Sequence, residues 1–136
     1  MENCQLCQAY KNEKSRIFME NEHAFAIIAK WPLNEGHSMV LPKKHVKDLS
    51  ELPSEEIKAV MELCEKVVAK IDEKLDKSTI TMLNSKGCRT QEHLHFQLAP
   101  LKKEIGVRDL VNALEKNSLY PEVSDEQMNK LADQFK

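Results

Sequence analysis

The stretch from Glu92 to Pro100 alternates strictly between apolar and polar side chains, which predicts a β-strand. A strand sends successive side chains to opposite faces. The face that we expect to be buried carries Leu94, Phe96 and Leu98. The opposite face carries two imidazoles and an amide, about 7 Å from one to the next, from His93, His95 and Gln97. Imidazole is a nucleophile, a proton carrier and a metal ligand near neutral pH, so this row is a candidate functional site. The alternative is a half-buried strand whose polar face only meets water.

A long amphipathic pattern runs from Ser54 to about Lys77. Its apolar residues recur at three- and four-residue spacing, which predicts a helix with one buried face. Ser54 is the expected cap, and Glu55 and Glu56 favour the positive end of the helix. Cys64 falls on the apolar stripe, so we expect a core thiol there and not a ligand.

Short apolar segments predict four further strands, over 15–20, 24–29, 37–42 and 78–83. The second and third are joined by a connection that contains Pro and Gly, which favours an antiparallel hairpin. After Pro100 the chain becomes charged, with helical spacing over 107–115 and 125–135. Ser124 and Gln127 have the spacing of a capping box at the second of these helices.

Composition narrows the class of protein. A chain of 136 residues has the size of one domain, and we expect a single domain over 1–136. The net charge of −2 argues against general affinity for nucleic acid or acidic membranes, so neither is expected as a partner. No apolar run approaches the ~20 residues that span a bilayer, and the N-terminus lacks the regions of a signal peptide. These features predict a cytoplasmic protein.

The N-terminal segment is short and polar and contains Cys4-x-x-Cys7. This pattern fits a zinc half-site, a redox pair or two unrelated cysteines. A redox pair usually sits at a helix start that follows a strand, and no strand can precede residue 4, so zinc is favoured. A closed zinc site needs four N or S ligands. His45 and His93 complete that set if the segment folds over the ends of two strands. The competing interpretation is that these thiols and histidines are unrelated.

Several motifs together resemble the histidine triad (HIT) superfamily. They are Cys-x-x-Cys, the segment Gly36-His37-Ser-Met-Val-Leu-Pro-Lys-x-His45, Asn84, and His93-x-His95-x-Gln97. The resemblance covers a core of about 4–100 and leaves a helical extension of about 106–136. It implies an α+β fold, with an antiparallel sheet crossed by a long helix, and a homodimer. It also implies a nucleotide or nucleotide conjugate as substrate, which is hydrolysed or transferred through a covalent nucleotidyl-histidine.

The resemblance assigns roles to individual residues. The nucleophile is His95, with Gln97 beside it at the third triad position. The structural zinc ligands are Cys4, Cys7, His45 and His93. Asn84 matches a residue that touches phosphate in many members. Residues of the loop that follows are further candidates for phosphate binding: Lys86, Arg89 and the amides around Gly87. The alternative is a loop that only meets water. His37 is a candidate for the border of the nucleotide pocket; the alternative is a structural imidazole at the start of a strand.

Three departures bear on the reaction. Gln97 replaces a histidine, and an amide can bind a phosphate oxygen but cannot relay a proton. The same His-x-His-x-Gln pattern occurs in galactose-1-phosphate uridylyltransferase and dinucleoside-polyphosphate phosphorylases, which favours transfer to a phosphate-bearing acceptor. Ala29 stands where many members carry an aspartate for the ribose hydroxyls. The segment from Asn84 to His93 is short, and its order resembles the CDP-diacylglycerol pyrophosphatase branch. The alternative function is a catalytically weak nucleotide-binding module with a structural zinc.

Overall fold

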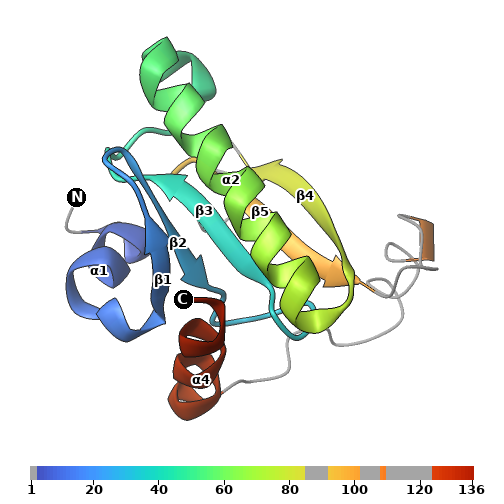
Figure 1. Ribbon diagram of the computed structural model, residues 1–136. Coiled ribbons are helices and arrows are strands. Elements are labelled where there is room, and N and C mark those ends of the chain that lie inside the picture. The colour runs from blue at the N-terminus through green and yellow to red at the C-terminus, as the bar shows by residue number, and fades with distance from the viewer. Residues whose placement is uncertain (1–2, 85–91, 102–107, 110–123) are drawn as a thin grey trace.

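The computed structural model describes residues 3–84, 92–101, 108–109 and 124–136. Within them, five antiparallel strands form one sheet in the order β1-β2-β3-β5-β4 (Figure 1). The strands are β1 (Ile17–Glu20), β2 (Ala24–Ile28), β3 (Ser38–Pro42), β4 (Ser78–Asn84) and β5 (His95–Leu101). These positions confirm the predicted strands and the antiparallel hairpin of β2 and β3. The first strand starts later than predicted, because Lys14–Arg16 forms a 3-10 turn before it.

Helix α2 (Ser54–Leu75) lies across one face of the sheet (Figure 1). Its buried stripe is Val60, Leu63, Cys64, Val67 and Ile71. Burial of each such apolar side chain contributes on the order of 1.5–3 kcal/mol to folding. Cys64 is confirmed as a core thiol, and burial raises its pKa to about 12, so it stays protonated. The predicted cap is wrong by one position: Pro53 is the N-cap, and Ser54 is the first helical residue.

Helix α4 (Asp125–Phe135) joins the same side of the sheet as α2. Its Met128, Ala132 and Phe135 enter the α2 cluster, where Phe135 packs edge-on against Phe18 of β1. The predicted capping box is present, because Ser124 accepts from the Gln127 backbone and the Gln127 side chain accepts from the Ser124 backbone. The other predicted helix, 107–115, lies outside the described residues apart from 108–109.

Helix α1 (Gln5–Asn12) packs against the opposite face of the sheet. Its Leu6 and Ala9 are buried against Phe25, Ile27 and Leu41. From the sequence we expected only a polar segment here. A helix of eight residues has little stability by itself and depends on tertiary packing, so its local sequence does not indicate it. The sheet is therefore covered by α2 and α4 on one side and partly by α1 on the other.

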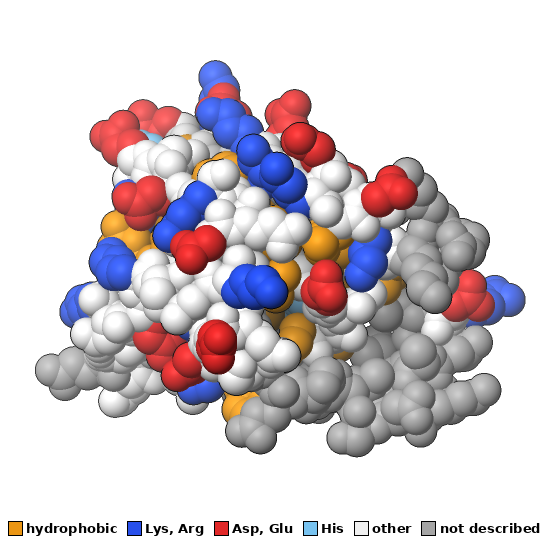
Figure 2. Space-filling view, turned by 60° about the horizontal axis from the view of Figure 1, so that its bottom comes forward, with side chains coloured by type: hydrophobic (Ala, Val, Ile, Leu, Met, Phe, Trp, Pro, Cys, Tyr) orange, Lys and Arg blue, Asp and Glu red, His pale blue; other side chains and the backbone are white. Residues whose placement is uncertain are grey.

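Charged side chains of both signs are intermixed over the face shown in Figure 2, in keeping with the small net charge. Among the described residues, no helix is long and apolar enough to cross a membrane.

Gly36 offers a direct test of the turn that precedes β3. Its φ of +88° is unfavourable for other residues, and a Cβ there would collide with Leu75 and lie 3.2 Å from Cγ of Pro100. We expect Gly36→Ala to lower the free energy of unfolding by about 1–3 kcal/mol, measured by chemical denaturation. Lys66→Ala, on the exposed side of α2, is the control and should change it by less than about 0.5 kcal/mol. An unchanged midpoint for Gly36→Ala would contradict this account of the turn.

Candidate functional site

The two histidines of the predicted polar row are buried and do not face bulk water, whereas Gln97 is partly buried. His93 and His95 are each 1% exposed, and Leu94 between them is fully buried on the other side. Leu94 packs with Val46 and Leu52 in a small cluster of its own. The water-facing interpretation of this strand is therefore wrong for its two histidines. Buried imidazoles need partners, and the contacts of each ring define two adjoining sites.

Four side chains that were predicted as ligands converge at one end of the sheet: Cys4, Cys7, His45 and His93. Their ligand atoms all lie within 4.8 Å of one another. Nδ1 of His93 is 3.5 Å from Sγ of Cys4 and 3.4 Å from Sγ of Cys7. A zinc ion with Zn–S of about 2.3 Å, Zn–N of about 2.0 Å and a tetrahedral angle separates sulfur from nitrogen by about 3.5 Å. The donor set and its spacing therefore fit a tetrahedral metal.

Strand pairing explains why residues so distant in sequence meet. His45 follows the end of β3 and His93 precedes the start of β5, and these two strands are antiparallel neighbours. The backbone N–H of Leu94 donates to the carbonyl of Val46 at 2.8 Å and ties the two segments together. Helix α1 adds the thiols, with Cys4 as its N-cap and Cys7 in its first turn. No pattern in the sequence indicated this helix start.

The hydrogen bonds of His93 prepare it as a ligand. Its Nε2–H donates to the carbonyl of Pro42 at 2.8 Å, which leaves the lone pair on Nδ1, the atom that faces both sulfurs. Such a second partner fixes the tautomer of a metal-binding histidine. Burial lowers the pKa of His93 to about 4, so the ring is neutral at pH 7. Burial also raises the pKa of Cys7, mainly by removing its thiol from water, so a cation is needed to hold a thiolate there.

The redox interpretation of Cys4 and Cys7 has to be weighed again, because the pair does lie at a helix start. Both cysteines are free thiols. However, Sγ of Cys7 is also 3.5 Å from Nδ1 of His45, so two imidazole nitrogens point at this sulfur. That arrangement favours a metal site over a thiol-disulfide pair.

His95 lies next to the metal cluster and has the hydrogen bonds of a neutral base. Its Nδ1–H donates to the carbonyl of His93 at 2.7 Å, so the free lone pair is on Nε2. Burial lowers the pKa of His95, which keeps the ring unprotonated at neutral pH. A neutral, oriented imidazole is the form that attacks an electrophile.

Gln97 and His37 continue this set of contacts away from the metal. The side-chain nitrogen of Gln97 is 2.9 Å from Nε2 of His95, and its oxygen is 2.5 Å from Nε2 of His37. His37 is 5% exposed, and burial lowers its pKa. The sequence predicted that His37 borders a nucleotide pocket, but it offered no signal that His37 would bind Gln97, because the two residues are 60 positions apart.

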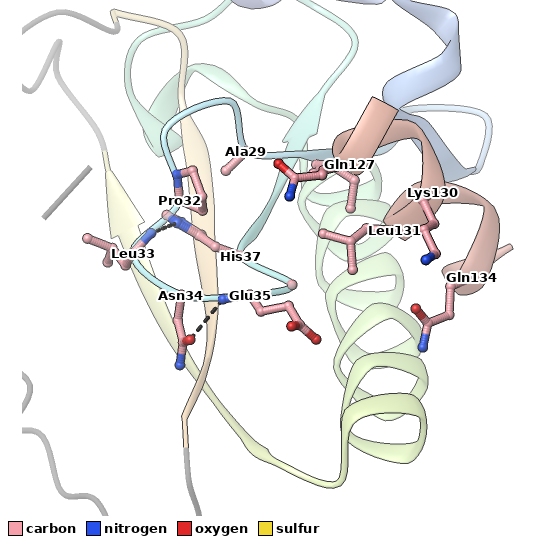
Figure 3. A pocket seen from close by; sticks show the side chains of 12 residues that line it. Ala29, Pro32, Leu33, Asn34, Glu35, His37, Gln127, Lys130, Leu131 and Gln134 are labelled. Carbon is pink, nitrogen blue, oxygen red and sulfur yellow. Dashed lines mark hydrogen bonds between the residues drawn. The ribbon is translucent and has the colours of Figure 1, made fainter. Parts of the chain in front are cut away.

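A groove of about 510 Å³ opens between the segment 29–36 and helix α4 (Figure 3). Its walls include Ala29 and His37 on one side and Gln127 and Lys130 of α4 on the other. The side-chain amide of Asn34 donates to the carbonyl of Pro100 at 2.7 Å and anchors the segment to β5. The sequence left the role of the C-terminal helices open, and α4 proves to form one wall of this groove.

Most of the predicted phosphate contacts lie outside the described residues. Asn84 ends β4, and its backbone is paired opposite His95, the nucleophile candidate. The side chain of Asn84, together with Lys86, Arg89 and the Gly87 loop, lies outside the described residues. Their roles stay predictions.

Comparison with family models identifies the family of the chain. The family model for the HIT domain matches residues 10–104, which is most of the chain. The chain belongs to the HIT family.

Relatives of similar length support this assignment. An uncharacterised 16.1 kDa HIT-like protein of Mycoplasma pneumoniae is 31% identical over 135 residues, which cover 96% of this chain and 93% of that protein. The adenosine 5′-monophosphoramidase HNT1 of Saccharomyces cerevisiae is 28% identical over 103 residues, covering 74% of this chain and 64% of that one. A zinc-bound histidine triad protein of Mycobacterium smegmatis shares the fold, with a TM-score of 0.72, 20% identity and coverage of 97% and 92%. HIT proteins include nucleotide hydrolases and transferases.

Proposed function

We propose that this protein is a nucleotide hydrolase or nucleotidyltransferase that acts at the α-phosphate through a covalent nucleotidyl-histidine on His95. One observation carries the proposal: His95 is buried and neutral, with Nδ1–H held by the carbonyl of His93 and the lone pair left on Nε2. The family adds that its members include enzymes acting on nucleotides. Asn84, Lys86 and Arg89 are the predicted contacts to the phosphate oxygens.

The proposed reaction has two steps, formation and breakdown of the adduct, and neither needs a proton relay. Nε2 of His95 attacks the α-phosphorus, and the bond to the leaving group breaks with its electron pair on that group. The ring keeps its proton on Nδ1, hydrogen-bonded to the carbonyl of His93, and carries the positive charge of the adduct. Water or a second acceptor then attacks phosphorus, the P–N bond breaks and its electron pair returns to Nε2. The proton of the attacking group leaves to solvent.

Gln97 favours one class of leaving group. Its amide can donate a hydrogen bond but cannot supply a proton, so the leaving group has to depart as an anion. Phosphate, pyrophosphate and phosphate esters do so readily at neutral pH, whereas amines do not. The galactose-1-phosphate uridylyltransferase of Haemophilus influenzae, 37% identical over 59 residues that make up 17% of that protein, also points to transfer between phosphates. We therefore favour phosphoanhydride substrates.

The same contacts support a second candidate, a catalytically weak nucleotide-binding module. In the resting site the Gln97 amide already occupies the lone pair of His95 at 2.9 Å. A module of this kind would bind nucleotide at the same residues without forming an adduct.

A substrate panel separates the two candidates. We expect dinucleoside polyphosphates and sugar nucleotides, supplied with and without inorganic phosphate, to yield a mononucleotide or its transfer product. Turnover should be at least about 10-fold faster than with nucleoside phosphoramidates, measured as kcat/KM. A nucleotidyl adduct should be trapped in the wild type and absent in His95→Ala. Binding without turnover on every compound would favour the module and contradict the enzyme.

A structural zinc is proposed at the four-ligand cluster. Zinc there would be held by Cys4, Cys7, His45 and His93 and would fasten α1 to the ends of β3 and β5. His93 also supplies the carbonyl that orients His95, so metal binding supports the nucleophile without touching substrate.

Removal of one thiol tests the metal. The purified chain should contain about one zinc per protein, and Cys4→Ser should lose it and melt at a lower temperature, because the ligand set is incomplete. Metal content is measured by plasma mass spectrometry and stability by thermal unfolding. Cys64→Ala is the matched control: its thiol is buried away from the cluster, so its zinc content should stay that of the wild type. Full zinc retention in Cys4→Ser would overturn the assignment.

A homodimer is proposed from the family likeness. The edge strand β4 and helix α2 carry exposed large apolar side chains, Leu83 at 42% and Met61 at 48%, which are candidates for the interface. We expect light scattering after size exclusion to give twice the 15.7 kDa chain mass, and a weaker dimer in Leu83→Lys. A monomer at micromolar concentration would contradict this proposal.

A further inference from the structure

His37, Gln97 and His95 form a chain of hydrogen bonds whose first donor is a backbone group. The N–H of Leu33 lies 2.9 Å from Nδ1 of His37 (Figure 3). A backbone N–H can only donate, so Nδ1 of His37 must accept. A neutral imidazole carries a single N–H, which for His37 is then on Nε2. The tautomer of His37 is thus determined by the backbone of the segment 29–36.

That tautomer orients the next group. Nε2–H of His37 faces the side chain of Gln97 at 2.5 Å, and only the amide oxygen can accept there. The amide nitrogen is therefore turned to the other side, where it lies 2.9 Å from Nε2 of His95. A rotated amide would place two donors against each other at His37 and two acceptors against each other at His95.

The hydrogen bonds of His95, at the other end of this series of contacts, independently require the same orientation of the Gln97 amide. The carbonyl of His93 can only accept, so His95 donates from Nδ1 and its Nε2 is an acceptor. Gln97 must then donate to His95. The N–H of Leu33 and the carbonyl of His93, at opposite ends of the series, thus require the same orientation of the Gln97 amide.

We infer that His37 is a positioning residue that keeps the Gln97 amide turned with its N–H toward the reacting nitrogen of His95. When phosphorus bonds to that nitrogen, the N–H of Gln97 is placed to donate to a phosphoryl oxygen and to stabilise its charge. Without His37 the amide oxygen loses its buried donor, and the group is free to rotate and present oxygen to an anion. The reaction-related part of this inference rests on the proposed function, whereas the hydrogen-bond directions do not.

Nuclear magnetic resonance tests the directions without any substrate. In the zinc-loaded wild-type protein at pH 7, long-range ¹H–¹⁵N spectra should show His37 as the Nε2–H tautomer and His95 as the Nδ1–H tautomer. His37 as the Nδ1–H tautomer, or as an imidazolium, would overturn the inference even if the protein proved to be an active enzyme.

Variants test the consequence for catalysis. His37→Phe keeps an aromatic ring but removes the donor, and we expect kcat to fall about 10-fold or more with little change in KM, because the donor to the phosphoryl group is misplaced. His37→Gln, which can restore an N–H toward Gln97, should recover part of that loss. Gln97→Glu, which still accepts from His37 but has no N–H to donate, should lose at least about 100-fold. His23→Phe is the control, because His23 lies outside this chain of contacts and should leave kcat unchanged.

The outcomes separate the two proposals. If the wild type turns over none of the panel, the proposed function fails, and the tautomers alone decide the positioning inference. If the wild type is active and His37→Phe folds and turns over at the wild-type rate, the positioning inference is wrong and the enzyme stands. If His37→Phe does not fold, the decision rests on the wild-type tautomers and on Gln97→Glu. The predicted tautomers together with a loss of at least about 100-fold in Gln97→Glu support the inference, and an unchanged kcat in Gln97→Glu contradicts it.

Discussion

His93 is the residue on which both halves of the site depend. Its ring places Nδ1 against two sulfurs while Nε2–H is held by the carbonyl of Pro42, and its own carbonyl holds Nδ1–H of His95. One residue thus orients the metal cluster through its side chain and the nucleophile candidate through its backbone. His95 is the first residue of β5 and His93 lies two positions before it, so the carbonyl of His93 is close enough to accept from the His95 ring. Any shift of this strand would disturb the metal cluster and the reacting nitrogen together.

Each of the three buried imidazoles, of His37, His93 and His95, is hydrogen-bonded to a backbone group. Each imidazole in the row is neutral because burial disfavours its charged form, and each is held in one tautomer by a partner that can only donate or only accept. Neutral rings in defined tautomers are useful both to a metal and to phosphorus, because both need an unprotonated nitrogen. Among the described side chains, no buried polar atom lacks a hydrogen-bond partner, so this polar row does not leave an uncompensated group in the interior.

Local pattern was sufficient for most of the fold. The strands, helix α2, helix α4 and its capping box all follow from spacing and from residue types, because their buried faces are periodic in sequence. Helix α1 did not follow, because its stability comes from packing Leu6 and Ala9 on the sheet. The cap of α2 was misplaced by one residue, since either Pro53 or Ser54 is compatible with a helix start.

The sequence by itself determined which side chains could do chemistry and which of them share a strand face. Alternation alone predicted that His95 and Gln97 lie on one side of a strand, because a period of two is a property of the local backbone. The structure places both in β5 and His93 just before it. Tertiary structure decided what each of them contacts. Cys4 reaches His93 across 89 positions, and His37 reaches Gln97 across 60, through the pairing of β3 with β5 and the docking of α1. The tautomer of each ring and the orientation of the amide depend on which backbone carbonyl or N–H faces them. Contacts between distant segments produce no repeating pattern in a sequence, so the sequence could not predict them.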